Sequence, residues 1–149
     1  MNATKLIVAA AVFAAFTGSA MAQGKSEVNL RNAQQSQSGG FLNKQNAEIG
    51  TVKGNGSSKV TADGIRQSQS GGFLNKQDLV IGKVDGGGKS DVNARNIRQS
   101  QSGGFLNKQE MTIGYVKGNG TAKVTVDNLA QSQSGGFLNK QTMDVGSVR

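Results

Sequence analysis

The side chains of this sequence that could act together chemically are amides, because histidine and cysteine are both absent. Without them there is no Ser-His-Asp triad, no cysteine nucleophile and no imidazole or thiolate to bind a metal. The carboxylates are scattered through the chain without the close pairing that acid–base catalysis needs. We therefore expect a protein that is not an enzyme and that holds no cofactor or metal ion.

Glutamine and asparagine recur in a fixed pattern instead. The string QSQSGGFLNKQ starts at Gln35, Gln67, Gln99 and Gln131, with a constant spacing of 32 residues. An amide side chain carries both donors and an acceptor, so identical amides stacked at one strand spacing can form a continuous ladder of hydrogen bonds. A buried amide without partners costs about 1–3 kcal/mol. The repeat therefore predicts a stack in which each amide lies against its equivalents.

Each repeat supplies the same set of stacking and turn residues. The predicted ladder and self-assembly positions are Gln35, Gln37, Phe41, Asn43 and Gln45; Gln67, Gln69, Phe73, Asn75 and Gln77; Gln99, Gln101, Phe105, Asn107 and Gln109; and Gln131, Gln133, Phe137, Asn139 and Gln141. The predicted turn positions are the glycine pairs Gly39 and Gly40, Gly71 and Gly72, Gly103 and Gly104, and Gly135 and Gly136. Glycine suits these sites because it tolerates positive φ.

Alternation between the turns predicts strands. After the glycine pair of the second repeat, every other residue is apolar or an amide, from Phe73 to Ile81. A period of two is typical of a strand with one buried face. Because Phe73 shares this parity, we expect a buried phenylalanine column rather than an exposed platform for nucleic-acid bases. The parity of the apolar residues changes near Gly64 and Gly82, which predicts a bulge or kink at both points.

These features together predict an all-β fold, a β-solenoid or cross-β stack of four 32-residue strand-turn-strand repeats. The repeats are residues 26–57, 58–89, 90–121 and 122–149, within one domain covering residues 23–149. An antiparallel meander of eight strands is the alternative. The two architectures differ at Gln67 and Gln99, which are neighbours only in the solenoid.

The opposite face of the second strand carries a column of lysines that should repel itself. Each repeat also places an acid on that face, two or four residues further on, and pairing would offset the repulsion. The lysines are Lys44, Lys76, Lys108 and Lys140, and the acids are Glu48, Asp78, Glu110 and Asp144. The formal net charge is +8, with the basic residues spread evenly. We interpret them mainly as charges that keep the protein soluble.

The first 22 residues have the pattern of a secretory signal peptide. Lys5 precedes an apolar run from residue 6 to 16, and Ala20-Met21-Ala22 forms an A-x-A cleavage site. The run is too short to span a bilayer as a helix. We therefore expect cleavage after Ala22, no transmembrane span after processing, and a secreted protein at the extracellular cell surface.

The repeat resembles the curlin repeat of curli-type functional amyloids. The residues that carry the resemblance are Gln69, Gly71, Asn75 and Gln77, with their equivalents in the other repeats. This repeat is longer, its Gly-to-Asn spacing is one residue wider, and Lys-Gln stands where the family has an alanine. The resemblance implies secretion across both membranes of a Gram-negative cell and fibre assembly outside it.

The functional expectation is a structural subunit of a secreted, self-assembling, amyloid-like fibre that serves in adhesion or a biofilm matrix. Its partner would be another copy, added head to tail, with a nucleator or secretion machinery as further partners and no specific nucleic acid. The alternatives are a non-polymerising surface adhesin or matrix-binding module, and a nucleator of a related fibre.

Overall fold

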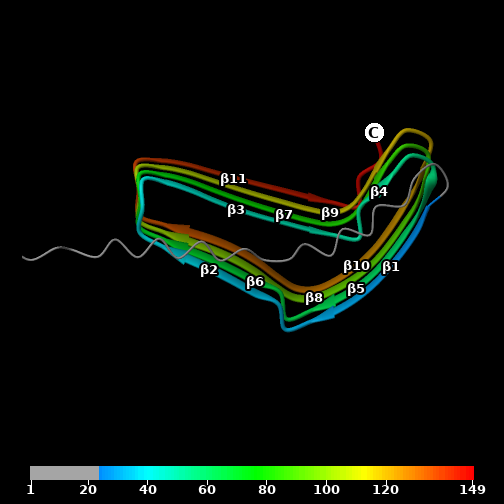
Figure 1. The fold of residues 1–149 in the computed structure, drawn as a ribbon, viewed down its shortest axis with the longest axis horizontal. Helices are drawn as coiled ribbons and strands as arrows, with labels where there is room; N and C mark the ends of the chain where they lie inside the picture. Colours follow the sequence, from blue (N-terminus) through cyan, green and yellow to red (C-terminus); the bar gives the residue numbers. More distant parts are fainter. Residues whose placement is uncertain (1–23) are drawn as a thin grey trace, which may run out of the picture.

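The computed structural model describes residues 24–149, which wind into a parallel β-solenoid (Figure 1). The predicted signal peptide, residues 1–22, lies outside the described residues. The strands are β1 (Lys25–Arg31), β2 (Gln34–Ser38), β3 (Leu42–Ile49), β4 (Val52–Lys53), β5 (Gly56–Asp63), β6 (Arg66–Ser70), β7 (Leu74–Asp85), β8 (Gly88–Ser102), β9 (Leu106–Lys117), β10 (Gly120–Ser134) and β11 (Leu138–Val145). We call each turn of the solenoid a rung: β1–β4, β5–β7, β8–β9 and β10–β11.

Each rung contributes one strand path to each of two sheets. The first sheet has the order β1-β5-β8-β6-β2, with β10 paired to β8, and the second has the order β11-β9-β7-β3, with β4 paired to β7. Every pair is parallel and joins residues 32 apart, so that Gln67 lies beside Gln99. The predicted β-solenoid is therefore confirmed, and the antiparallel meander is wrong.

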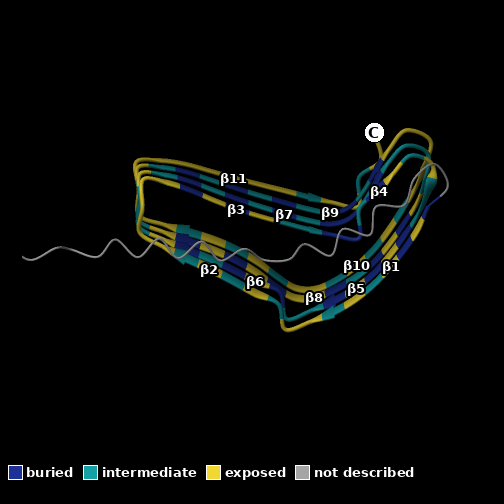
Figure 2. Cartoon of the chain, viewed as in Figure 1, coloured by how far each residue is buried: buried dark blue, intermediate teal, exposed yellow. Residues whose placement is uncertain are grey.

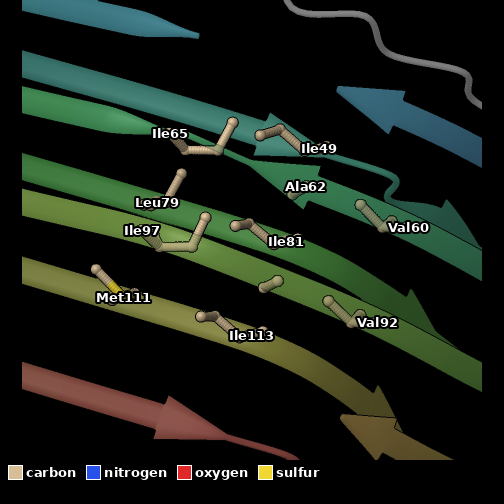
Figure 3. Close-up of a cluster of buried hydrophobic side chains, with 11 residues drawn as sticks. Ile49, Val60, Ala62, Ile65, Leu79, Ile81, Val92, Ile97, Met111 and Ile113 are labelled. Carbon is tan, nitrogen blue, oxygen red and sulfur yellow. The ribbon is translucent and has the colours of Figure 1, made fainter. Parts of the chain in front are cut away.

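The core lies between the two sheets and repeats from rung to rung. Figure 3 shows aliphatic side chains of successive strands pointing into the same interior. The buried members of this cluster are Ile49, Val60, Ala62, Ile65, Leu79, Ile81, Val92, Ala94, Ile97, Met111 and Ile113. A second, smaller cluster of Val52, Val84 and Val116 fills the interior beyond the kink in the second sheet.

Each rung has two kinks. At each kink the inward–outward alternation of side chains shifts by one residue, so that apolar residues before and after the kink both point inward. Gly82 has a φ of 68°, and Gly64 has a φ of 69°. At the position of Gly64 the other rungs have asparagine, with φ of 54–55° at Asn32, Asn96 and Asn128. Asparagine is among the few residues that enter the left-handed region at modest cost. The predicted kinks near Gly64 and Gly82 are thus confirmed.

The predicted burial of the phenylalanine column is wrong. The rings do stack, with parallel planes and centroids 5.1–5.3 Å apart. Their exposed fractions, however, range from 41% at Phe73 to 74% at Phe137. The second strand begins only at the following leucine, after two glycines with positive φ. Phenylalanine therefore belongs to the corner, and the strand alternation does not extend to it.

The kink glycines allow a matched test of packing in the interior. Gly82 and Gly146 have the same φ of 68°, but a Cβ at Gly82 would collide with Val92 Cγ2, whereas one at Gly146 would be 3.7 Å from its nearest atom. We expect Gly146→Ala to destabilise by about 1–2 kcal/mol through backbone strain alone. Gly82→Ala should lose about 1–3 kcal/mol more through overpacking. Chemical denaturation checks this, and equal losses would contradict the packing argument.

Candidate functional site

The first glutamine column of the interior is a continuous ladder. Gln67 Nε2 donates to Gln35 Oε1 at 2.9 Å, Gln99 to Gln67 at 2.8 Å, and Gln131 to Gln99 at 2.9 Å. Gln67 and Gln99 are fully buried in the middle rungs. Because each donor has the acceptor of the preceding rung, burial leaves the amide hydrogen bonded. The predicted ladder is confirmed for this column.

Two further columns of the second sheet run in the same way. The third glutamine of each repeat donates to the rung before it, at 2.7 Å from Gln77 to Gln45, 2.7 Å from Gln109 to Gln77 and 2.9 Å from Gln141 to Gln109. The asparagine column donates in the opposite direction, with Nδ2 to Oδ1 distances of 2.9 Å from Asn43 through Asn75 and Asn107 to Asn139. Both columns confirm the predicted stacking, and the asparagine column runs in one direction along the stack.

Among the amide side chains of the site, asparagine forms the most hydrogen bonds. Asn75 Nδ2 donates to Asn107 Oδ1 at 2.9 Å and to the carbonyl of Gly71 at 2.7 Å. Its Oδ1 accepts from Asn43 and from Gln69. All four hydrogen-bonding positions of the amide are therefore used. The side chain ties together its own turn, the opposite strand of its own rung and both neighbouring rungs.

The second glutamine column differs from the predicted ladder. Gln37, Gln69 and Gln101 each donate across the interior to the asparagine of their own rung, at 2.9, 3.3 and 3.1 Å. In this column the only side-chain bond between described rungs joins Gln133 to Gln101 at 3.3 Å. The reason is position, since this glutamine lies next to the turn and the asparagine of its own rung is within hydrogen-bonding distance.

The second glycine of each turn makes room for the asparagine. Gly72 has a φ of 90°, and a Cβ there would collide with Asn43 Nδ2 and approach Asn75 Oδ1 to 2.7 Å. The first glycine, Gly71, needs a positive φ of 66° but has 3.6 Å to its nearest neighbour. Both glycines therefore occupy turns as predicted, and the second is fixed by the amide column as well as by the backbone.

The outer lysine column is neutralised only in the middle rungs. Lys76 pairs with Asp78 at 2.7 Å and with Glu110 at 3.8 Å, and Lys108 pairs with Glu110 at 2.8 Å. Hydrogen bonding to Asp78 raises the pKa of Lys76, and hydrogen bonding from Lys108 lowers the pKa of Glu110. The predicted pairing is thus confirmed where the acid is two residues away.

Pairing fails where the acid lies four residues from the lysine. Asp144 pairs with Arg149 at 3.4 Å instead of Lys140, and Glu48 forms no ion pair within residues 24–149. Four residues along a strand span about 13 Å, which a lysine cannot cover. Lys44 and Lys140, the members of this column in the first and last rungs, therefore form no ion pair in the part of the chain that the structure describes.

Sequence reasoning missed a column of leucines beside the lysines. Leu42, Leu74, Leu106 and Leu138 line an open groove on the outer face, together with the flanking lysines and asparagines of all the rungs. Leu42 is 68% exposed and Leu138 55% exposed. The alternation of the strand marks these leucines as outward-facing, which is the signal that could have found them.

The asparagine node gives a second test. Asn75→Ala would leave partners in two neighbouring rungs and in its own turn without their bonds, and we expect a loss of about 3 kcal/mol or more. Asn139→Ala, at the exposed end of the same column, should lose about 1 kcal/mol or less. Urea denaturation of both variants checks the difference. Similar losses of stability at the two positions would contradict the larger contribution expected of the interior asparagine.

The ion pair on the outer face predicts a small acid dependence. Because the pKa of Glu110 is lowered by folding, its contribution is present above the unfolded pKa of about 4.3 and disappears as pH falls through the folded value. Both side chains are about 40% exposed, so Glu110→Gln should lose only about 0.2–1 kcal/mol at pH 7. The difference from wild type should vanish by about pH 3. Glu48→Gln is the control, and an equal effect there would refute the assignment.

Residues 24–149 contain no cluster of three or more histidine, cysteine, aspartate or glutamate side chains that could hold a metal ion. Over the same residues no helix is long and apolar enough to cross a membrane. Comparison with known proteins gives no match to a family model, to a curated protein or to a solved structure.

Proposed function

We propose that this protein is a structural subunit that stacks on further copies of itself to form an extracellular, amyloid-like fibre. The observation that carries the proposal is the uncovered last rung. Val145 is 42% exposed and Met143 44% exposed, although their equivalents Ile113 and Met111 in the rung below are 0% and 1% exposed. Figure 2 shows β11 exposed along most of its length. One more rung would bury these core-type side chains.

Both ends of the stack keep the interior residues of the middle rungs. The first rung has Gln35, Asn43 and Gln45, and the last has the equivalent Gln131, Asn139 and Gln141. Repeat proteins usually end in capping units with a polar outer surface, and folded β-proteins shield their edges with proline or charge. This sequence has no proline. The best partner for either end is therefore the opposite end of another copy, and such a heterologous contact yields an open filament.

The directions of the ladders favour head-to-tail addition. In the glutamine column, Gln131 Oε1 of the last rung would accept from an added copy, and Gln35 Nε2 of the first rung would donate to one. The asparagine column presents the reverse, with Asn139 Nδ2 as a donor and Asn43 Oδ1 as an acceptor. Placing the first rung of one copy on the last rung of another continues every ladder.

The extracellular setting rests on the sequence. The signal-peptide pattern in residues 1–22 supports export with cleavage after Ala22, and the resemblance to curlin repeats supports assembly outside a Gram-negative cell. The same resemblance supports a role in adhesion or a biofilm matrix, with a nucleator or secretion machinery as additional partners. A role without catalysis is consistent with an interior occupied by ladders and aliphatic packing.

A surface adhesin or matrix-binding module is the second candidate, and one observation favours it. The stacked phenylalanines form a continuous exposed ladder beside the leucine groove. Exposed contiguous apolar surface often marks an interaction site. An adhesin would use this ladder as a monomer, whereas a fibre subunit would extend it from copy to copy. A nucleator of a related fibre would share the uncovered last rung.

Blocking the last rung tests the fibre proposal. Val145→Lys places a charge on a side chain that is half-exposed in the monomer and would be buried by an added copy. We expect a folded monomer with near-wild-type circular dichroism, and elongation of wild-type seeds reduced at least tenfold at the capped end. Thioflavin fluorescence and single-filament imaging measure elongation.

Two matched variants control this experiment. Val145→Ile restores the residue found at Ile113 and should elongate like wild type, and Ile113→Lys buries a charge and should prevent folding. A wild-type protein that stays monomeric for days with seeds would favour the adhesin. Elongation of Val145→Lys from both ends at the wild-type rate would refute stacking through this rung.

A further inference from the structure

Two columns on the outer face of the first sheet alternate in charge from rung to rung. One column reads Glu27, Lys59, Asp91 and Lys123, and the other reads Arg31, Asp63, Arg95 and Asp127. Each residue is the direct strand partner of the next in its column. Neighbouring members are thus one strand spacing apart, about 4.8 Å, and opposite in sign throughout.

This alternation belongs to the surface of the first sheet and has no counterpart in the lysine column of the second. Lys59 Nζ lies 3.7 Å from Glu27, and Asp63 accepts a hydrogen bond from Asn96 in the next rung at 2.9 Å. Glu27 and Lys59 have side chains about 60% exposed. Burial therefore does not dictate the residue types at these positions. What is kept along each column is the alternation in the sign of the charge.

Because the number of rungs is even, the two ends of each column carry charges of opposite sign. Alternation over four rungs starts one column with Glu27 and ends it with Lys123, and it starts the other with Arg31 and ends it with Asp127. If the first rung of a second copy continues the same register on the last rung, Glu27 of that copy lies beside Lys123, and Arg31 lies beside Asp127. Both columns then continue their alternation across the junction.

We propose that these two columns form the surface that sets the register of a second copy of this chain, an inference that rests on the proposed stacking of copies. A strand slip by an even number of residues keeps the same parity inward along one strand, although it moves the amide columns and the kinks out of line. A slip of four residues would also place Glu27 beside Asp127 or Arg31 beside Lys123. Like charges would then meet, and only the continued register pairs both columns.

The remaining charges at the junction are of like sign, which leaves the two columns as the attractive pair. Continuing the register would bring Lys44 beside Lys140, Lys53 beside Arg149 and Glu48 beside Asp144. Arg149 and Asp144 already pair with each other at 3.4 Å. The second sheet therefore adds repulsion at the junction, and the charges of the first sheet oppose it.

Charge reversal at opposite ends tests the proposal. One variant carries Glu27→Lys and Arg31→Glu in the first rung, and the other carries Lys123→Glu and Asp127→Arg in the last. Either variant alone would bring like charges together in both columns at its own junctions. A mixture would restore opposite charges when the first rung of one variant meets the last rung of the other.

We expect each variant to elongate its own seeds at least about tenfold more slowly than wild type, and an equimolar mixture to recover much of that rate by alternating the two chains. The defect should shrink in 1 M NaCl, where the screening length is about 3 Å. Fluorescent labels of two colours report whether both variants enter the same filament. Recovery in the mixture also excludes misfolding as the cause of the defect.

An internal reversal supplies the control. Lys59→Glu with Asp63→Arg changes the same columns within the chain but leaves both ends unaltered, so its self-elongation should match wild type once circular dichroism shows it folded. If wild type forms filaments and both end variants elongate their own seeds at the wild-type rate, the charge inference alone is overturned. Wild-type protein that never elongates would instead overturn the proposed function.

Discussion

The structure depends on one constraint: every side chain lies beside its own equivalent 32 residues away, one strand spacing above or below. A buried position can therefore hold only residues that pack or bond well with their own kind. Aliphatic side chains satisfy this by contact, and carboxamides satisfy it because each carries both a donor and an acceptor. The pairing of Gln67 with Gln99 and the contact of Ile81 with its neighbours follow from the same rule.

The turn beside the amide columns shows how this constraint extends to the backbone. Asn75 bonds the carbonyl of Gly71, and its column passes so close to Gly72 that no side chain fits there. Turn and ladder are therefore one unit, in which the glycine admits the amide and the amide satisfies the carbonyl that the turn exposes. At the other end of each strand, kinks with positive φ bring apolar residues of both parities inward.

Much of this could be predicted because the repeat has no insertions. The constant spacing fixed the parallel pairing, and alternation placed Asn75 and Gln77 inside. Three outcomes depended on geometry that spacing does not contain. Phe73 lies on a corner formed by two glycines, Gln69 reaches across the interior to Asn75, and the acids four residues from a lysine are too far away to pair. Alignment of the repeats in columns would have revealed the alternating charges.

The alternating columns bear on how such a chain can change length in evolution. Duplication of one 32-residue unit would preserve every interior contact, because the new rung would present the same amides and aliphatic groups to its neighbours. It would also make the number of rungs odd, so that each charged column began and ended with the same sign. If copies stack as proposed, gain or loss of units in pairs keeps the ends complementary, and the outer surface then constrains repeat number more tightly than the core does.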